Sequence, residues 1–158
     1  MPAPAVDRFI AAAGELGLQP DVKTFPKDTR TAQQAADALG CELGQIVKSL
    51  IFSAGDDELV LVLTSGVNRV DEAKVAPLFG VPKLGKADAA GAREATGFAI
   101  GGIPPCGHPR RLRAVVDQDL LDWPTIWAAA GAPDAVFELT PQTLLDITGA
   151  APADVASR

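Results

Sequence analysis

The first apolar pattern in the chain has the period of an α-helix. Val6, Phe9, Ile10, Ala13 and Leu16 recur at intervals of three and four residues, and this spacing places them on one face of a helix. Gly17 follows, and glycine is a typical residue at a helix end. The pattern therefore predicts an amphipathic helix over residues 6–16.

Four more helices are predicted from residues that favour helix ends. Thr31 is a typical N-cap for the alanine-rich stretch that closes at Gly40. The other three are predicted from Asp71 to Phe79, from Asp88 to Ala95 and from Thr140 to Gly149. Beyond Ala150 no periodic pattern is visible, and the tail is predicted to fray.

Strands are predicted where short apolar or β-branched runs lie between turn residues. The run 46–52 is β-branched and apolar, and 59–63 is apolar throughout, as in a strand buried on both faces. Together they predict an antiparallel hairpin. Shorter strands are predicted at 22–25, 83–84, 112–116 and 136–139, while 125–130 fits either a strand or a helix.

Helices and strands are mixed without strict strand–helix–strand alternation, which favours the α+β class. The 158 residues contain no internal repeat, no low-complexity block and no linker, so we expect one domain over residues 1–158.

The charge balance limits the classes of ligand. The net charge is −6 and the isoelectric point about 4.7, which argues against a general nucleic-acid binder and against a duplex-DNA partner. It does not exclude a protein that grips only the tip of a tRNA. The apolar runs are too short to cross a bilayer, so no membrane partner is expected.

Cysteine and histidine usage predicts a cofactor-free protein. The two cysteines make no disulfide framework, and the first five residues do not resemble a secretory signal, so we expect a reduced, cytoplasmic location. The chain has one histidine, His108, and no spacing gathers Cys, His and carboxylate ligands into one site, so we expect no metal.

Lys48 is the first candidate functional residue. In a strand over 46–52 it shares a face with Ile46, Leu50 and Phe52. A lysine on an apolar face either packs its stem at an edge while its amine reaches water, or serves as a positive charge in an apolar cleft. In the second case it suits a phosphate or a ribose hydroxyl.

The second candidate is the loop from Gly101 to Pro109, which contains three glycines and three prolines. Glycine lets a backbone approach a ligand and present its N–H groups, and proline stiffens the loop. Rigid N–H donors suit a developing oxyanion. The alternative is an ordinary surface turn, which composition alone favours.

Three further side chains are weaker candidates. His108 is either a general base or a hydrogen-bonding loop residue, and the second reading is the commoner one. Cys106 as a nucleophile has only His108, two residues away, as a base. Asn68 is either a polar group that the hairpin returns to Lys48 or part of a solvated loop.

Two segments resemble the YbaK/ProX family, whose members are relatives of the editing insertion domain of bacterial prolyl-tRNA synthetase. They are QIVKSLIF at residues 45–52 and TGFAIGGIPP at residues 96–105. The resemblance extends from Thr31 to the final helix. It implies a curved, barrel-like mixed β-sheet surrounded by helices, and metal-free deacylation of mischarged aminoacyl-tRNA in trans.

The resemblance also implies roles for individual residues. Lys48 would hold the tRNA 3′ end, and the backbone of Gly101, Gly102, Ile103, Pro104 and Pro105 would position the ester carbonyl and the water. Thr31 would line the pocket, and so would Ala129, which lies in an alanine run where some relatives have a serine. We add Asn68 and His108 as substrate-binding candidates. The implied substrate is a small amino acid, with tRNA-Pro as its carrier and prolyl-tRNA synthetase as a candidate partner. The alternative is a non-catalytic module that binds aminoacyl-tRNA or a nucleotide.

Overall fold

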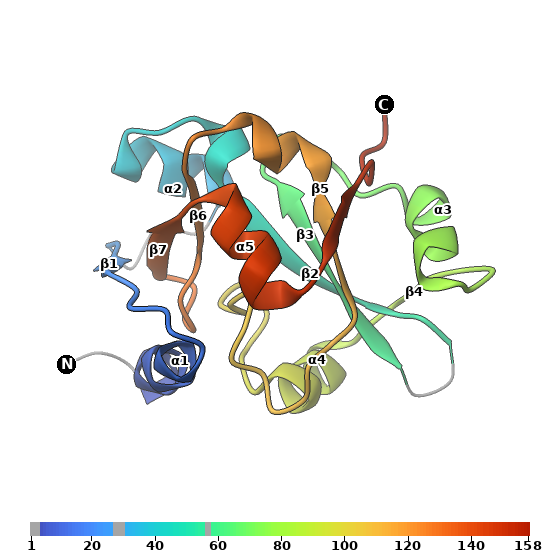
Figure 1. Ribbon diagram of the computed structural model, residues 1–158, viewed down its shortest axis with the longest axis horizontal. Helices are drawn as coiled ribbons and strands as arrows, with labels where there is room; N and C mark the ends of the chain where they lie inside the picture. Colours follow the sequence, from blue (N-terminus) through green and yellow to red (C-terminus); the bar gives the residue numbers. More distant parts are fainter. Residues whose placement is uncertain (1–3, 27–30, 56–57) are drawn as a thin grey trace.

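The computed structural model describes residues 4–26, 31–55 and 58–158 (Figure 1). The helices are α1 (Pro4–Glu15), α2 (Ala32–Leu39), α3 (Glu72–Val75), α4 (Ala89–Thr96) and α5 (Pro141–Thr148). The strands are β1 (Val22–Thr24), β2 (Val47–Ser53), β3 (Leu59–Ser65), β4 (Gly85–Lys86), β5 (Ala114–Asp117), β6 (Ile126–Ala129), β7 (Ala135–Leu139) and β8 (Ala151–Ala153). Short 3₁₀ turns cover Leu43–Gln45, Ala76–Phe79 and Gln118–Asp122.

The strands form two open sheets, and this mixture of helices and sheets confirms the α+β class. The smaller sheet has the order β1-β7-β6 and the larger one β4-β2-β3-β5-β8, with β3, β5 and β8 parallel to one another. A single parallel bridge between Ile46 and Trp127 joins the start of β2 to β6. In the part of the chain that the structure describes, the predicted barrel-like sheet is thus two sheets joined by one backbone bridge, and they do not close.

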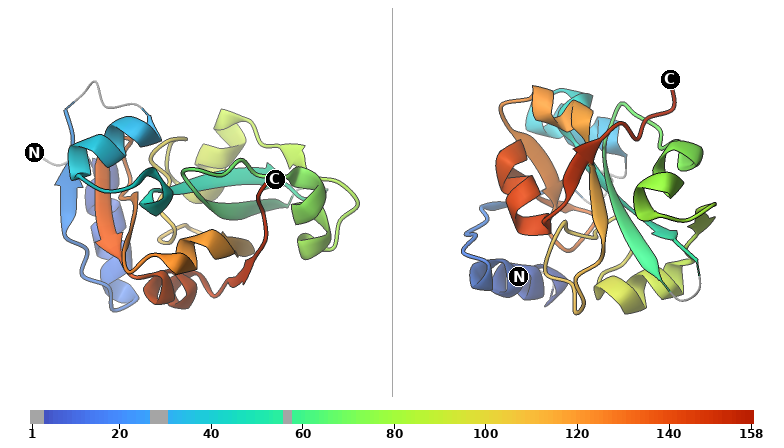
Figure 2. Two further views of the ribbon diagram at one scale, coloured as in Figure 1. Left: turned by 90° about the horizontal axis from the view of Figure 1, so that it is seen from above. Right: turned by 45° about the vertical axis from the view of Figure 1, so that its right-hand side comes forward.

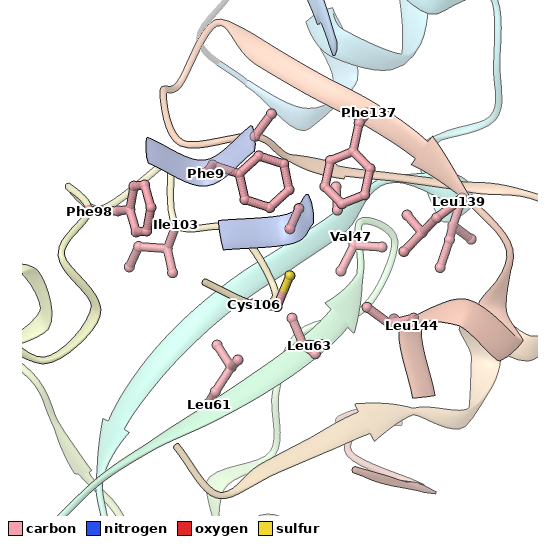
Figure 3. Close-up of a cluster of buried hydrophobic side chains, with 14 of the residues drawn as sticks. Phe9, Val47, Leu61, Leu63, Phe98, Ile103, Cys106, Phe137, Leu139 and Leu144 are labelled. Carbon is pink, nitrogen blue, oxygen red and sulfur yellow. The ribbon is translucent and has the colours of Figure 1, made fainter. Parts of the chain in front are cut away.

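The main core lies between the two sheets and is covered by α1 (Figure 3). Phe9 of α1 packs on Phe137 of β7, with ring centroids 5.0 Å apart. Leu61 and Leu63 of β3 face this core, while the alternate β3 residues face a second cluster that includes Phe79. The prediction that 59–63 is buried on both faces is therefore confirmed. Figure 2 shows α1, α2 and the smaller sheet at one end of the molecule and α3 at the other.

Capping residues account for most of the helix ends. The Thr31 hydroxyl accepts the Gln34 N–H at 3.1 Å, the Gln34 side chain accepts the Thr31 N–H at 3.0 Å, and Gly40 ends α2 with a left-handed conformation. The predicted helix from Asp71 to Phe79 becomes a 3₁₀ turn in its second half, where Pro77 provides no N–H.

Two strand predictions are refined by pairing. Residues 126–129, which fitted either a helix or a strand, form β6 because they pair antiparallel with β7. The short strand predicted at 83–84 lies instead at 85–86, where it pairs with the end of β2. At twelve residues, the longest helix in the described part of the chain is far too short to cross a bilayer.

The C-terminal tail is ordered, so the prediction that it frays was wrong. Ala151–Ala153 form β8 beside β5, and Val155 and Ala156 are fully buried. Val155 packs in the second apolar cluster, and its carbonyl accepts the Asp71 N–H at 2.8 Å. Burial and backbone pairing hold this segment, although its sequence has no periodicity that would predict them.

Candidate functional site

A cavity of about 280 Å³ opens where the start of β2 meets the smaller sheet and the loop that follows α4. Its lining is mainly apolar, with few side chains that can make hydrogen bonds. The residues that line it are Phe25, Thr31, Ala32, Ala35, Ile46, Val47, Lys48, Ser49, Leu50, Ile100, Gly101, Ile103, Trp127, Ala129, Pro133 and Val136. Lys48 is the one charged side chain among them.

Lys48 is half-buried, and its amine is held in a defined position. Its Nζ donates a hydrogen bond to the backbone carbonyl of Asn68 at 3.0 Å. Burial lowers the pKa of the Lys48 ammonium, and the negative charge of Asp117 opposes this shift. The side chain is therefore a positive group at the cavity wall with one protein acceptor, which leaves further N–H donors of the ammonium for a ligand.

A buried carboxylate fixes the loop that holds Lys48. Asp117 is fully buried at the end of β5, and one of its oxygens accepts hydrogen bonds from the Thr64 hydroxyl, the Ser65 N–H and the Asn68 amide at 2.8–3.0 Å. The other oxygen accepts the Asp119 N–H at 2.9 Å. Four hydrogen bonds compensate the cost of burying the charge. They also orient Asn68, so that its carbonyl faces Lys48.

The loop Gly101–Pro105 leaves few N–H donors for a ligand. Gly102 donates its N–H to the Ala99 carbonyl at 3.0 Å, and prolines have no N–H to donate. Within the described ranges, the N–H groups of Gly101 and Ile103 have no hydrogen-bond acceptor. Both residues line the cavity, so these two backbone groups are its candidate oxyanion donors.

The glycines of this loop serve backbone packing more than ligand approach. A Cβ on Gly102 would lie 2.7 Å from the Cα of Ala132 in the β6–β7 connection, so only glycine permits this contact. Gly101 has a φ of +93°, which side chains rarely adopt. The loop is therefore held at a fixed position against the β6–β7 connection.

The structure brings five of the ten sequence-predicted site residues into one cavity. Thr31, Lys48, Gly101, Ile103 and Ala129 line it together, although the Thr31 hydroxyl caps α2.

The other five predicted residues lie elsewhere. Gly102 and Pro104 are buried and are not among the residues that line the cavity. The Asn68 side chain binds the carboxylates of Asp117 and Asp119, and only its carbonyl reaches Lys48. Pro105 and His108 line a separate cavity of about 470 Å³.

His108 has a structural role on that other side of the loop. Its Nε2 donates a hydrogen bond to the Pro104 carbonyl at 2.7 Å, and its ring meets Phe98 edge-on. Burial lowers the pKa of His108, and the hydrogen bond to Pro104 opposes the shift. These contacts hold the Pro104 end of the loop from Gly101 to Pro109 and place the imidazole away from Lys48.

This arrangement predicts a pH dependence of stability. Because the folded pKa of His108 lies below the unfolded value of about 6.5, the unfolded state binds more protons as the pH falls below 6.5. The free energy of unfolding should therefore drop more between about pH 7.5 and pH 5.5 in the wild type than in His108→Gln. Urea unfolding at both pH values measures the difference, and equal drops would contradict the assignment.

Several cavity residues were missed by sequence reasoning. Phe25, Ser49, Trp127 and Val136 look like ordinary strand residues, and no sequence signal separates them from core positions. Asp117 did give a signal, because it is a carboxylate at the end of the apolar run 114–116. No group of three or more His, Cys, Asp and Glu side chains within the described ranges is arranged to hold a metal ion.

Comparison with known proteins identifies the family. The model of the aminoacyl-tRNA editing domain family matches residues 26–147, most of the chain. The chain belongs to this family. A similar solved structure, described as that of a candidate trans-editing enzyme for prolyl-tRNA synthetase, is 46% identical, with a TM-score of 0.95 and full coverage of both chains.

Two curated relatives agree with the assignment to the aminoacyl-tRNA editing domain family. The uncharacterized protein YwhH of Bacillus subtilis is 31% identical over 81% of this chain and 81% of its own length. The proline–tRNA ligase of Leuconostoc mesenteroides is 33% identical over 80% of this chain but only 21% of its own length. The resemblance to the editing insertion of prolyl-tRNA synthetases is therefore confirmed.

Proposed function

We propose that this editing domain hydrolyses the ester bond of mischarged aminoacyl-tRNA in trans, and that its carrier is tRNA-Pro. The observation that carries the proposal is one cavity that combines a half-buried ammonium at Lys48 with the free N–H groups of Gly101 and Ile103. The similarity to a candidate trans-editing enzyme and to a proline–tRNA ligase supports aminoacyl-tRNA as the class of substrate.

Each group has a role that follows from its chemistry. The Lys48 ammonium anchors the 3′-terminal nucleotide through a phosphate or ribose oxygen. The N–H groups of Gly101 and Ile103 stabilise the negative charge that develops on the ester oxygen. Rigid donors in an apolar cavity have their largest effect because little water competes with them.

The reaction needs water but no metal in this proposal. The water oxygen bonds to the carbonyl carbon, the bond between that carbon and the ribose oxygen breaks, and one water proton ends on the ribose hydroxyl. Among the described residues, no His, Asp or Glu side chain lines the cavity, so in this proposal the proton passes through a ribose hydroxyl of the tRNA or a second water. An aminoacyl ester is already activated, and positioning the reactants contributes a large part of the rate.

Substrate size is the expected basis of selection. Ile103, Ala129 and Pro133 give one part of the cavity an apolar wall, and none of these three side chains offers a hydrogen-bonding group to a substrate. Alanyl-tRNA and similarly small esters should be hydrolysed fastest, and phenylalanyl- or tyrosyl-tRNA hardly at all. An apolar site separates substrates by about 1–3 kcal/mol per methylene, so neighbouring sizes should overlap.

A panel of mischarged tRNAs under single-turnover conditions tests both the activity and the selection. Ile103→Ala should admit larger esters, and Ile103→Val should do so to a smaller extent with a lower stability cost, since Ile→Val costs about 0.5–1.5 kcal/mol. Binding without hydrolysis of any ester would show a non-catalytic module. A preference for aromatic esters would contradict the steric explanation.

A further inference from the structure

The edge of β2 that faces the cavity has a gap in its backbone pairing. The Gly66 N–H donates to the Ile46 carbonyl, and at the other end the Ala54 N–H donates to the Glu58 carbonyl. Because antiparallel ladders alternate, the even-numbered residues of β2 direct their N–H and C=O groups toward β3. The groups of the odd-numbered residues, Ser49 among them, point to the opposite edge.

Ser49 lies between the two neighbours on that edge. On one side β6 meets the start of β2 through the bridge from Ile46 to Trp127, and on the other β4 pairs with Phe52 and Ser53. Ser49 itself lines the cavity. In the described part of the chain, no strand residue is in register with Ser49 on this edge. Its side-chain hydroxyl is buried without a hydrogen bond.

Unpaired backbone groups at the wall of an apolar cavity need a partner. A ligand that satisfies both groups of one strand residue must offer an N–H and a carbonyl bonded to the same carbon atom, as a residue of a paired strand does. An aminoacyl ester has this arrangement, because its ammonium-bearing carbon is bonded directly to its ester carbonyl.

We propose that the aminoacyl group docks on the edge of β2 as a single strand residue opposite Ser49. The Ser49 N–H donates to the ester carbonyl, and the Ser49 carbonyl accepts from the α-ammonium. This inference rests on the proposed deacylase function and adds a third backbone donor to those of Gly101 and Ile103.

The docking mode fixes the direction of the substrate side chain. Directly opposed strand residues direct their side chains to the same face of a sheet. The face of Ser49 is also that of Val47 and Ile51, which pack in the same core cluster as Ile103. An L-aminoacyl side chain is therefore aimed toward Ile103, whereas a D-aminoacyl side chain is aimed toward the face of Lys48.

Two measurements test the docking mode. In the wild type, L-alanyl-tRNA should be hydrolysed at least about tenfold faster than D-alanyl-tRNA in single turnover. Replacing the Ser49 N–H by an ester oxygen, through the α-hydroxy analogue of serine, should slow L-alanyl-tRNA hydrolysis on the order of tenfold, because one donor is lost. The matched control is the same replacement at Phe52, whose N–H faces β3 and not the cavity.

The outcomes separate this inference from the proposed function. If neither enantiomer nor any other aminoacyl-tRNA is hydrolysed, the deacylase proposal fails and the docking mode fails with it. If L-alanyl-tRNA is hydrolysed but D-alanyl-tRNA reacts equally fast, or if the ester at Ser49 slows hydrolysis no more than the ester at Phe52, deacylation stands and the docking mode is overturned. Both effects together support it.

Discussion

Lys48→Ala should lower the rate of aminoacyl-tRNA deacylation by about one to two orders of magnitude. A hydrogen bond to a charged group contributes about 1.5–3 kcal/mol, and the Lys48 ammonium is the one charged side chain among the described residues that line the cavity. The fold should persist, because the side chain is only half-buried and its ammonium makes one hydrogen bond, to the Asn68 carbonyl. Single-turnover hydrolysis of alanyl-tRNA measures the loss.

Lys74→Ala is the matched control for this loss of charge. Lys74 forms an ion pair with Asp154 at 3.0 Å and donates to the Ala156 carbonyl, so it secures the C-terminal tail outside the cavity. The Lys74→Ala variant should keep the wild-type deacylation rate, while its free energy of unfolding should fall slightly. If a folded Lys48→Ala variant hydrolyses alanyl-tRNA at the wild-type rate, Lys48 has no anchoring role.

The local parts of the fold follow from the sequence because their causes are local. The β2–β3 hairpin comes from two adjacent apolar runs, and the α2 boundaries come from Thr31 and Gly40, whose capping contacts lie within a few residues. The number of sheets does not follow in this way. The number of sheets depends on which strand edges pair. In the described part of the chain, the two sheets are joined only by the bridge between Ile46 and Trp127.

The candidate site was predictable in its main residues but not in their grouping. Lys48 stands out as a charge in an apolar strand, and the Gly–Pro loop stands out by composition. Sequence proximity then misleads, because the chain turns inside the loop and His108 faces the second cavity although Ile103 faces the first. Asp117 reaches Asn68 across 49 positions of sequence, and no local pattern reveals that contact.

Gly102→Ala should abolish most of the deacylation, because it displaces the loop Gly101–Pro105 that carries the proposed oxyanion donors. The new Cβ would lie 2.7–2.9 Å from three backbone atoms of Ala132, and backbone cannot rotate away as a flexible side chain can. The loop must shift, and it carries Gly101 and Ile103 with it. A misplacement of about 1 Å can cost on the order of 100-fold in rate, and overpacking costs about 1–3 kcal/mol of stability.

Gly14→Ala is the matched glycine control, because a Cβ there meets no atom within 4 Å and the position lies inside α1. It should keep the wild-type deacylation rate and gain about 0.5–1 kcal/mol of stability, since glycine is costly within a helix. Hydrolysis of alanyl-tRNA and urea unfolding separate the two variants. Gly102→Ala should lose far more activity than its lost stability explains, because the displaced N–H groups of Gly101 and Ile103 no longer face the ester oxygen. Full activity in Gly102→Ala would show that the position of this loop does not control the reaction.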